Sequence, residues 1–174
     1  MLHPVWRSQS GFWAIFLALL ISLLGLARPA FALIHRYPEG GDRVMVRSLQ
    51  TLRDSQEHAW QLVLFKHQQG GKTQSIYLRL VGFPEVVQLQ HPGEIELATL
   101  RSAKRWRAPE VLSGTPSAPH IGEYDLMAIM GQIDTDSALR LTLPLQNAFE
   151  EIILPPYVIK EWRQLAFGDD SFTP

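Results

Sequence analysis

The sequence predicts an α+β domain made mainly of antiparallel β-hairpins, in a sheet that could be strongly curved, with two short amphipathic helices. The main observation is a segment, residues 58–83, in which two apolar runs, 60–65 and 76–81, flank Gly70 and Gly71. Branched and aromatic residues on either side of a Gly-Gly pair are typical of a β-hairpin. The first run is apolar on both faces, so we expect a central strand that is covered on both sides.

The length of the loop at Gly70 and Gly71 decides which residues of this hairpin share a face. A two-residue turn would place Phe65 opposite Ile76 and Val63 opposite Leu78. A three-residue loop would exchange the two faces, because successive side chains of a strand point to opposite sides. The sequence leaves this register open.

Four more segments around the hairpin have strand-like patterns, after a turn at residues 37–42. These segments are residues 43–52, 86–90, 95–100 and 101–107. Pro92 and Gly93 fit a type II turn, so the second and third segments are expected to form a hairpin. The charge of the fourth suits an edge strand, because charged side chains resist pairing with other chains.

The second half of the chain begins with a proline-rich stretch, residues 108–122, which we expect to be a long ordered loop. Asp125 is a plausible N-cap for a short amphipathic helix, since the apolar residues behind it have helical spacing. These residues are Leu126, Ile129, Met130 and Ile133.

Leucines alternate with polar residues in the segment 139–145, which predicts a strand buried on one face. Pro144 favours an edge position for it, because proline cannot donate a ladder hydrogen bond. The segment 149–154 is expected to pair with it through a loop at Gln146 and Asn147. A final helix is expected to start at Pro155 and Pro156, with Val158, Trp162 and Leu165 on one face.

The amino-acid composition limits the classes of protein to which the chain can belong. The chain of 174 residues is 46% hydrophobic and 19% charged, which is ordinary for a globular domain. Its formal net charge of −1 gives no strong field, so we expect no nucleic acid partner. There is no cysteine, which excludes disulfides and thiol nucleophiles.

Residues 1–32 have the pattern of a signal peptide. Arg7 gives a positive start, residues 11–27 form an apolar core, and Ala30 and Ala32 supply the small residues that signal peptidase requires. Cleavage after Ala32 would leave residues 33–174 as a single exported globular domain. The alternative is an uncleaved membrane anchor, because the apolar run approaches the length that crosses a bilayer.

Sequence motifs for catalysis and cofactor binding are absent, so no catalytic residue, cofactor or metal site is predicted. There is no G-x-S-x-G, no phosphate-binding glycine motif and no H-E-x-x-H. His58 and His67 flank one strand and are expected to be solvent-facing strand ends. The segment 134–137 resembles the start of a calcium loop, but Ala138 occupies the third ligand position, so a turn is favoured. The pairs Glu123 with Asp125 and Glu150 with Glu151 are expected to be solvated.

One basic segment is a candidate partner-binding site. It contains Arg101, Lys104, Arg105, Trp106 and Arg107. An exposed Trp106 among these cations would suit an anionic membrane surface or an acidic face of a membrane protein complex. The alternative is a solvated edge strand whose Trp106 points into the core.

Several runs of the chain resemble a family of exported cyanobacterial proteins that is known only as a domain of unknown function. These runs are residues 37–40, 47–54, 59–66, 78–84, 122–125 and 155–165. The resemblance covers essentially the whole chain after residue 32. It implies the periplasm or the thylakoid lumen and an association with the photosynthetic membrane, but it brings no catalytic residues.

Two classes of function are therefore expected. The first is a non-enzymatic accessory or assembly protein that binds a membrane complex, in the photosynthetic membrane or elsewhere, from the exported side. The alternative is a small-ligand carrier or an unrecognised hydrolase, with a pocket in a curved sheet lined by Trp60, Tyr77 or Phe83.

The protein purified from its source should begin at Leu33, because signal peptidase is expected to cut after Ala32. N-terminal sequencing or intact-mass measurement checks this. An intact first residue in a soluble fraction would contradict the prediction.

Overall fold

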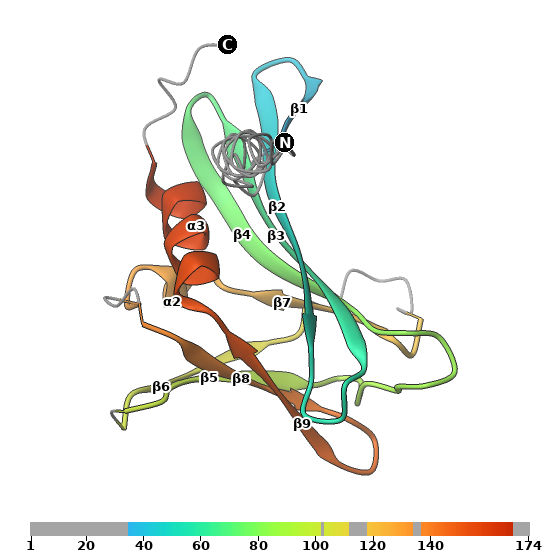
Figure 1. Cartoon of the computed structure of the whole chain (residues 1–174). Coiled ribbons are helices and arrows are strands. Elements are labelled where there is room, and N and C mark those ends of the chain that lie inside the picture. The colour runs from blue at the N-terminus through green and yellow to red at the C-terminus, as the bar shows by residue number, and fades with distance from the viewer. Residues whose placement is uncertain (1–34, 102, 112–117, 134–136, 169–174) are drawn as a thin grey trace, which may run out of the picture. The chain divides into compact units, whose positions relative to one another are not determined.

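The chain folds into two antiparallel sheets with two helices in its described part, as the computed structural model in Figure 1 shows. The structure describes residues 35–101, 103–111, 118–133 and 137–168. The signal-peptide segment, part of the expected long loop and the calcium-like residues 134–136 lie outside these ranges. Ala32–Pro174 form one compact unit. In the described part, no helix is both long enough and apolar enough to cross a membrane.

The five-stranded sheet has the order β1-β2-β3-β4-β7 and the four-stranded sheet has the order β6-β5-β8-β9. The strands are β1 (His35–Gly40), β2 (Arg43–Arg53), β3 (Ala59–Gln69), β4 (Lys72–Val81), β5 (Glu94–Thr99), β6 (Arg105–Pro109), β7 (Ile121–Asp125), β8 (Leu139–Pro144) and β9 (Phe149–Leu154). The helices are α2 (Met127–Met130) and α3 (Pro156–Phe167). The predicted α+β class is confirmed.

The central hairpin has the two-residue turn, with φ of 56° at Gly70 and 74° at Gly71. A β-bulge then shifts the register between His67 and Gln68, so that Phe65 lies opposite Tyr77 rather than Ile76. The extra residue moves every later side chain of β4 to the other face. It thereby puts the apolar residues of β4 on the core face, beside those of β3.

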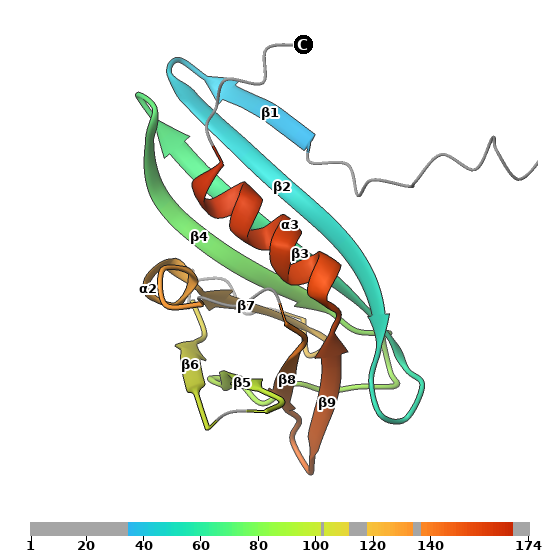
Figure 2. The same ribbon diagram turned by 60° about the vertical axis from the view of Figure 1, so that its left-hand side comes forward.

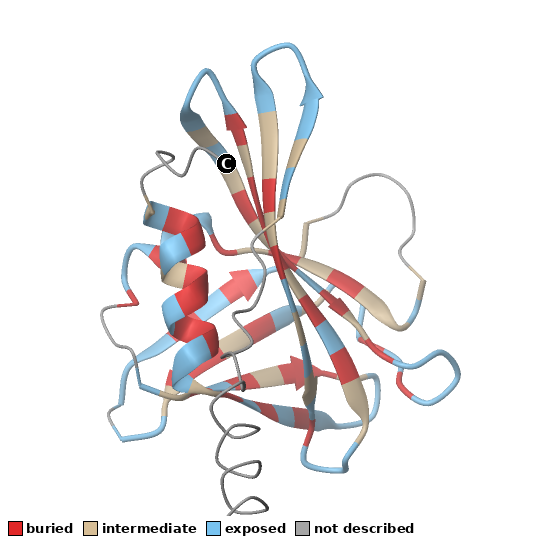
Figure 3. Ribbon diagram, turned by 45° about the horizontal axis from the view of Figure 1, so that its top comes forward, coloured by how far each residue is buried: buried red, intermediate tan, exposed pale blue. Residues whose placement is uncertain are grey.

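Strand β3 is central, but it is buried on one face more than on the other. Trp60, Leu62 and Leu64 are fully buried on the core face, while Gln61 is exposed and Val63 half-buried on the outer face. The expectation of cover on both sides is therefore wrong for most of the strand. Figure 3 shows the alternation of buried and exposed residues along these strands.

Helix α3 packs against one face of the five-stranded sheet, over β2 and β3 (Figure 2). As expected, Val158, Trp162 and Leu165 are buried, in the same core cluster as the leucines of β3. The helix starts with a proline at its first position, where no backbone N–H is needed. One polar contact also joins helix and sheet, because Gln50 Nε2 donates to Glu161 Oε2 at 2.8 Å.

The four-stranded sheet differs from the expectation at two places. Residues 86–90 contribute only an isolated bridge, Leu89 with Leu145, so the predicted hairpin with β5 does not form. β5 pairs instead with β6 and β8, and the peptide bond before Pro92 is cis. β8 is central rather than an edge strand, because Pro144 is its last residue and costs little pairing there.

Three other expectations concern shorter elements. β6 is an edge strand of its sheet, as predicted, although it begins at Arg105. β1 and β7 were not expected, since the sequence indicates a turn and a loop there. The helix behind Asp125 has one turn, and the Asp125 carboxylate accepts a hydrogen bond from the Met127 N–H at 2.8 Å.

Isolated backbone bridges join the two sheets at two places. Asp54, which follows β2, bridges to Ile152 of β9, and Glu110, which follows β6, bridges to Tyr124 of β7. Asp54 also organises the β2–β3 turn, because its buried carboxylate accepts hydrogen bonds from Trp60 Nε1 and from the N–H groups of Gln56 and His58, each at 2.9 Å. This carboxylate thus holds the turn and the core tryptophan together.

Burial alone would raise the pKa of Asp54, but the hydrogen bonds from Trp60, His58 and Gln56 outweigh it and lower that pKa below its ordinary value. A carboxyl group with a lowered pKa in the folded state stabilises the fold at every pH above its unfolded pKa. This stability is lost as the pH falls through the lowered, folded pKa.

Asp54→Asn should lower the free energy of unfolding by about 2–3 kcal/mol at neutral pH, because the new amide N–H group faces donors. The loss should shrink as the pH falls below about 4, where the Asp54 side chain of the unfolded protein begins to bind protons, and should shrink further as the pH falls through the lowered pKa of the folded state. Urea unfolding at a series of pH values measures both effects.

Asp42→Asn, at an exposed turn position, is the control and should change stability by less than about 0.5 kcal/mol. An equal loss at neutral and acid pH would contradict the assignment.

Candidate functional site

The basic segment predicted from the sequence leads into β6, at the edge of the four-stranded sheet. Arg101, Lys104, Arg105 and Arg107 are exposed, but Trp106 is only 8% exposed and belongs to the core cluster. Its neighbours in the strand are charged, so alternation turns the indole inward. The idea of an exposed Trp106 is therefore wrong, and the alternative of a core tryptophan is confirmed.

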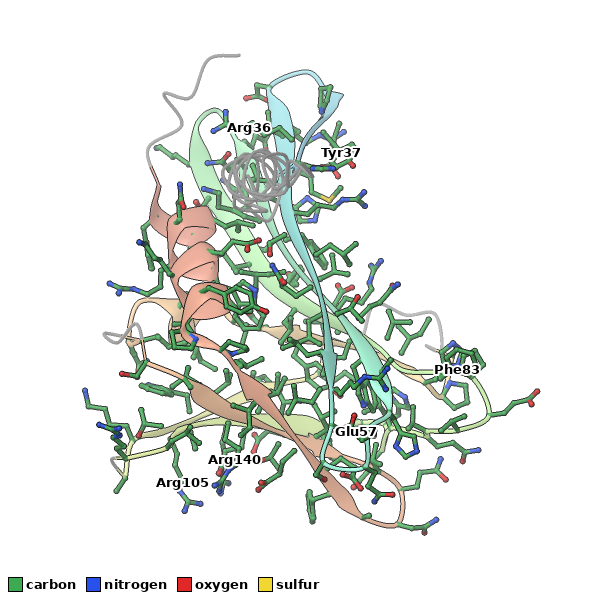
Figure 4. The ribbon with its side chains drawn as sticks, in the orientation of Figure 1. Arg36, Tyr37, Glu57, Phe83, Arg105 and Arg140 are labelled. Atoms are coloured by element: carbon green, nitrogen blue, oxygen red, sulfur yellow. The ribbon has the colours of Figure 1, made fainter. Side chains whose placement is uncertain are left out.

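The cations of β6 face acidic residues of the same sheet. Arg105 lies 3.3 Å from Glu96, and Arg107 lies 3.5 Å from Glu96 and 3.7 Å from Glu94. Arg105 and Arg140 project from the same side of this sheet (Figure 4), and Arg140 pairs with Glu151 at 3.3 Å. The outer face of the four-stranded sheet is thus largely neutralised by its own ion pairs.

The histidines and carboxylates considered from the sequence lie in separate pairs. His58 Nδ1 is 3.3 Å from Asp54, and His67 Nδ1 is 3.2 Å from Glu39. Both rings are partly exposed, as expected for strand ends. Within the described ranges, no group of three or more metal-binding side chains lies close together.

The two carboxylate pairs do not share a site. Glu123 binds Arg79, with Oε2 3.0 Å from Nε and 2.8 Å from Nη2. Glu150, which was expected to be solvated, is 4% exposed and accepts hydrogen bonds from Ser55 Oγ at 2.6 Å and from Gln56 Nε2. It therefore serves the β2–β3 turn, while Glu151 is on the opposite face of β9.

The residues proposed to line a pocket are also dispersed. Trp60 is fully buried and donates to Asp54, while Tyr77 lies on the outer face of β4. Phe83 is 64% exposed in the loop after β4, where Figure 4 shows it at the margin of the molecule. These three side chains do not surround one space.

The outer face of the five-stranded sheet carries an organised group of aromatic and arginine side chains. We call it the aromatic–arginine face, and it consists of Tyr37, Arg47, Leu49, Phe65, Tyr77 and Arg79. Its register is continuous across three strands, since Arg47 lies opposite Phe65, and Phe65 lies opposite Tyr77. Leu49, two residues beyond Arg47, is 53% exposed.

The side chains of this face are ordered by contacts with one another. The Arg47 guanidinium lies 4.5 Å from the centre of the Tyr37 ring and donates to its hydroxyl at 2.6 Å. The Arg79 guanidinium lies 5.3 Å from the centre of the Phe65 ring. Phe65 meets Tyr77 edge-on at 5.7 Å between ring centres. Such contacts reduce the rotamer freedom that binding would otherwise remove.

The arginines of this face differ in their partners. Four arginines of β2 and β4 point outward, namely Arg43, Arg47, Arg53 and Arg79. Arg53 pairs with Glu57 at 3.8 Å, and Arg79 pairs with Glu123. Within the described ranges, neither Arg43 nor Arg47 has a carboxylate partner. The sequence did not reveal this face, because its residues come from four strands and the bulge in β4 sets their alignment.

A family model described as "Protein of unknown function (DUF3122)" matches residues 32–165. No curated protein and no solved structure gives a significant match. The family match covers most of the chain but assigns no activity to any of its residues. Interpretation of the outer faces therefore depends on their geometry.

Trp106→Ala should lower the free energy of unfolding by about 3–5 kcal/mol, because it removes a buried indole. Arg105→Ala and Arg107→Ala, which break exposed ion pairs, should each cost less than about 1 kcal/mol. Urea unfolding compares the three variants. A Trp106 variant as stable as the arginine variants would show that the indole is not part of the core.

Proposed function

The chain belongs to the DUF3122 family of proteins of unknown function, and we propose that it is an exported, non-enzymatic accessory or assembly protein that binds a membrane protein complex. Its place is the periplasm or the thylakoid lumen of a cyanobacterium, where a photosynthetic complex is the first partner to examine. The signal-peptide pattern of residues 1–32 and the resemblance to exported proteins support this location.

The observation that carries the proposal is the aromatic–arginine face. Tyrosine, phenylalanine and arginine are enriched at protein interfaces, and tyrosine and arginine are frequent among the few residues that contribute most of the binding energy. Here they lie side by side on the outer face of a sheet, and Arg47 and Arg79 are both stacked on aromatic rings. A solvated sheet face needs only polar side chains, so this composition favours a surface that binds a partner.

The alternatives have less support. A small-ligand carrier or an unrecognised hydrolase was expected to use Trp60, Tyr77 or Phe83, but these residues lie in the core, on the outer face and in an exposed loop. The basic segment before and within β6 is a second candidate surface. Its Arg105 and Arg107 are already paired with glutamates, which weakens its attraction for an acidic partner.

Affinity isolation from membranes solubilised in mild detergent tests the function. A C-terminally tagged wild-type protein should recover a defined membrane complex, identified by mass spectrometry. Arg47→Glu should reduce this recovery at least about tenfold, because it reverses a charge at the centre of the face. Arg105→Glu, on the outer face of the other sheet, is the matched control and should retain the complex.

Two other results would change the conclusion. Loss of the complex with Arg105→Glu but not with Arg47→Glu would assign docking to the basic segment instead. Recovery of the wild-type protein alone would argue against the accessory function and in favour of a ligand carrier or an enzyme.

A further inference from the structure

We infer that the aromatic–arginine face recognises an acidic protein surface on which a carboxylate side chain lies next to an apolar one. Arg47 would bind the carboxylate, and Leu49 together with Val63 would receive the apolar group. The inference rests on the proposed function, which it extends by giving the chemistry of the partner.

The first step of the argument is that Arg47 is held in place before any partner binds. Its guanidinium lies 4.5 Å from the centre of the Tyr37 ring and donates to the Tyr37 hydroxyl at 2.6 Å. The residue is half-buried in the middle of β2, between the neighbouring strands β1 and β3. An arginine that is already ordered loses less rotamer entropy when it binds.

The second step concerns charge. The group that Arg47 contacts is a tyrosine hydroxyl, and no carboxylate of the described residues pairs with the Arg47 guanidinium. This sets Arg47 apart from Arg79, which is bound to Glu123. A guanidinium has five N–H donors, so those that Tyr37 leaves free can bind a carboxylate through two parallel hydrogen bonds. The charge of Arg47 is therefore complementary to an acidic partner.

The third step is the apolar neighbour. Leu49 is 53% exposed and lies opposite Val63, which is half-buried. Arg47 and Leu49 are two residues apart on one face of a strand, which separates them by about 7 Å. A partner that matches both would present a carboxylate and an apolar side chain at a similar spacing, as positions i and i+2 of an extended segment do.

The face suits a protein better than a lipid surface. Membrane binding by a peripheral protein needs apolar or aromatic side chains that enter the interface between headgroups and acyl chains. Phe65 is only 6% exposed and packs edge-on against Tyr77 and His67, so its ring does not project. A face whose aromatic ring does not project is better suited to another protein surface.

A titration followed by NMR tests the inference without a known partner. The full chain, labelled with ¹⁵N and ¹³C, is mixed with an acetylated peptide of alternating glutamate and leucine. Shifts are expected at the Arg47 Nε–H and at the Leu49 methyl groups. Arg47→Gln should weaken the peptide's binding at least about tenfold, and Arg47→Lys should weaken it less, because lysine keeps the charge but not the paired donors. Arg101→Gln, an exposed arginine outside the face, is the control and should bind as the wild type does.

Each other result overturns the inference. Shifts at these positions with phosphatidylglycerol vesicles, but not with the peptide, would identify a lipid surface as the partner. Shifts that depend only on the concentration of the protein would identify a second copy of the chain. No shift with any probe would remove the carboxylate assignment, while a complex recovered by affinity isolation would leave the proposed function standing.

Discussion

The buried carboxylate of Asp54 is the interaction on which the arrangement of the two sheets depends. Removing a carboxylate from water is costly unless its oxygens accept hydrogen bonds, and here the donors come from the β2–β3 turn and from Trp60. Satisfying that one group fixes the turn and orients the largest side chain of β3, next to the point where the Asp54 backbone bridges to β9. The core of the domain can then close between the sheets.

The two faces of the five-stranded sheet differ in the kinds of residue that they carry. Its inner face is filled with leucines that pack against α3 and the other sheet, and its outer face holds the aromatic and arginine side chains. The bulge after His67 makes this division possible, because without it Ile76 and Leu78 would lie on the outer face. One inserted residue therefore serves both stability and the composition of the binding surface.

Prediction from the sequence was correct for elements that depend on residues close together in the chain. The Gly70 turn, the β8–β9 hairpin and α3 follow from periodicity and turn residues within about a dozen positions. It failed where distant segments decide, since β7 becomes a strand only by pairing with β4, and the bulge has no signature that we could use. The same limit applies to the site. The burial of Trp106 was a stated alternative, but the aromatic–arginine face requires the register of four strands.

The position of α3 in the chain affects how the domain is completed during synthesis. The helix is the last described element, and Val158, Trp162 and Leu165 close the core over β2 and β3. Because a chain emerges from its N-terminus, both strands can pair long before their inner faces are covered. A chain without its α3 helix would expose Leu62 and Leu64 on the inner face of the sheet. Until α3 packs, the half-finished sheet is a natural target for chaperones and proteases.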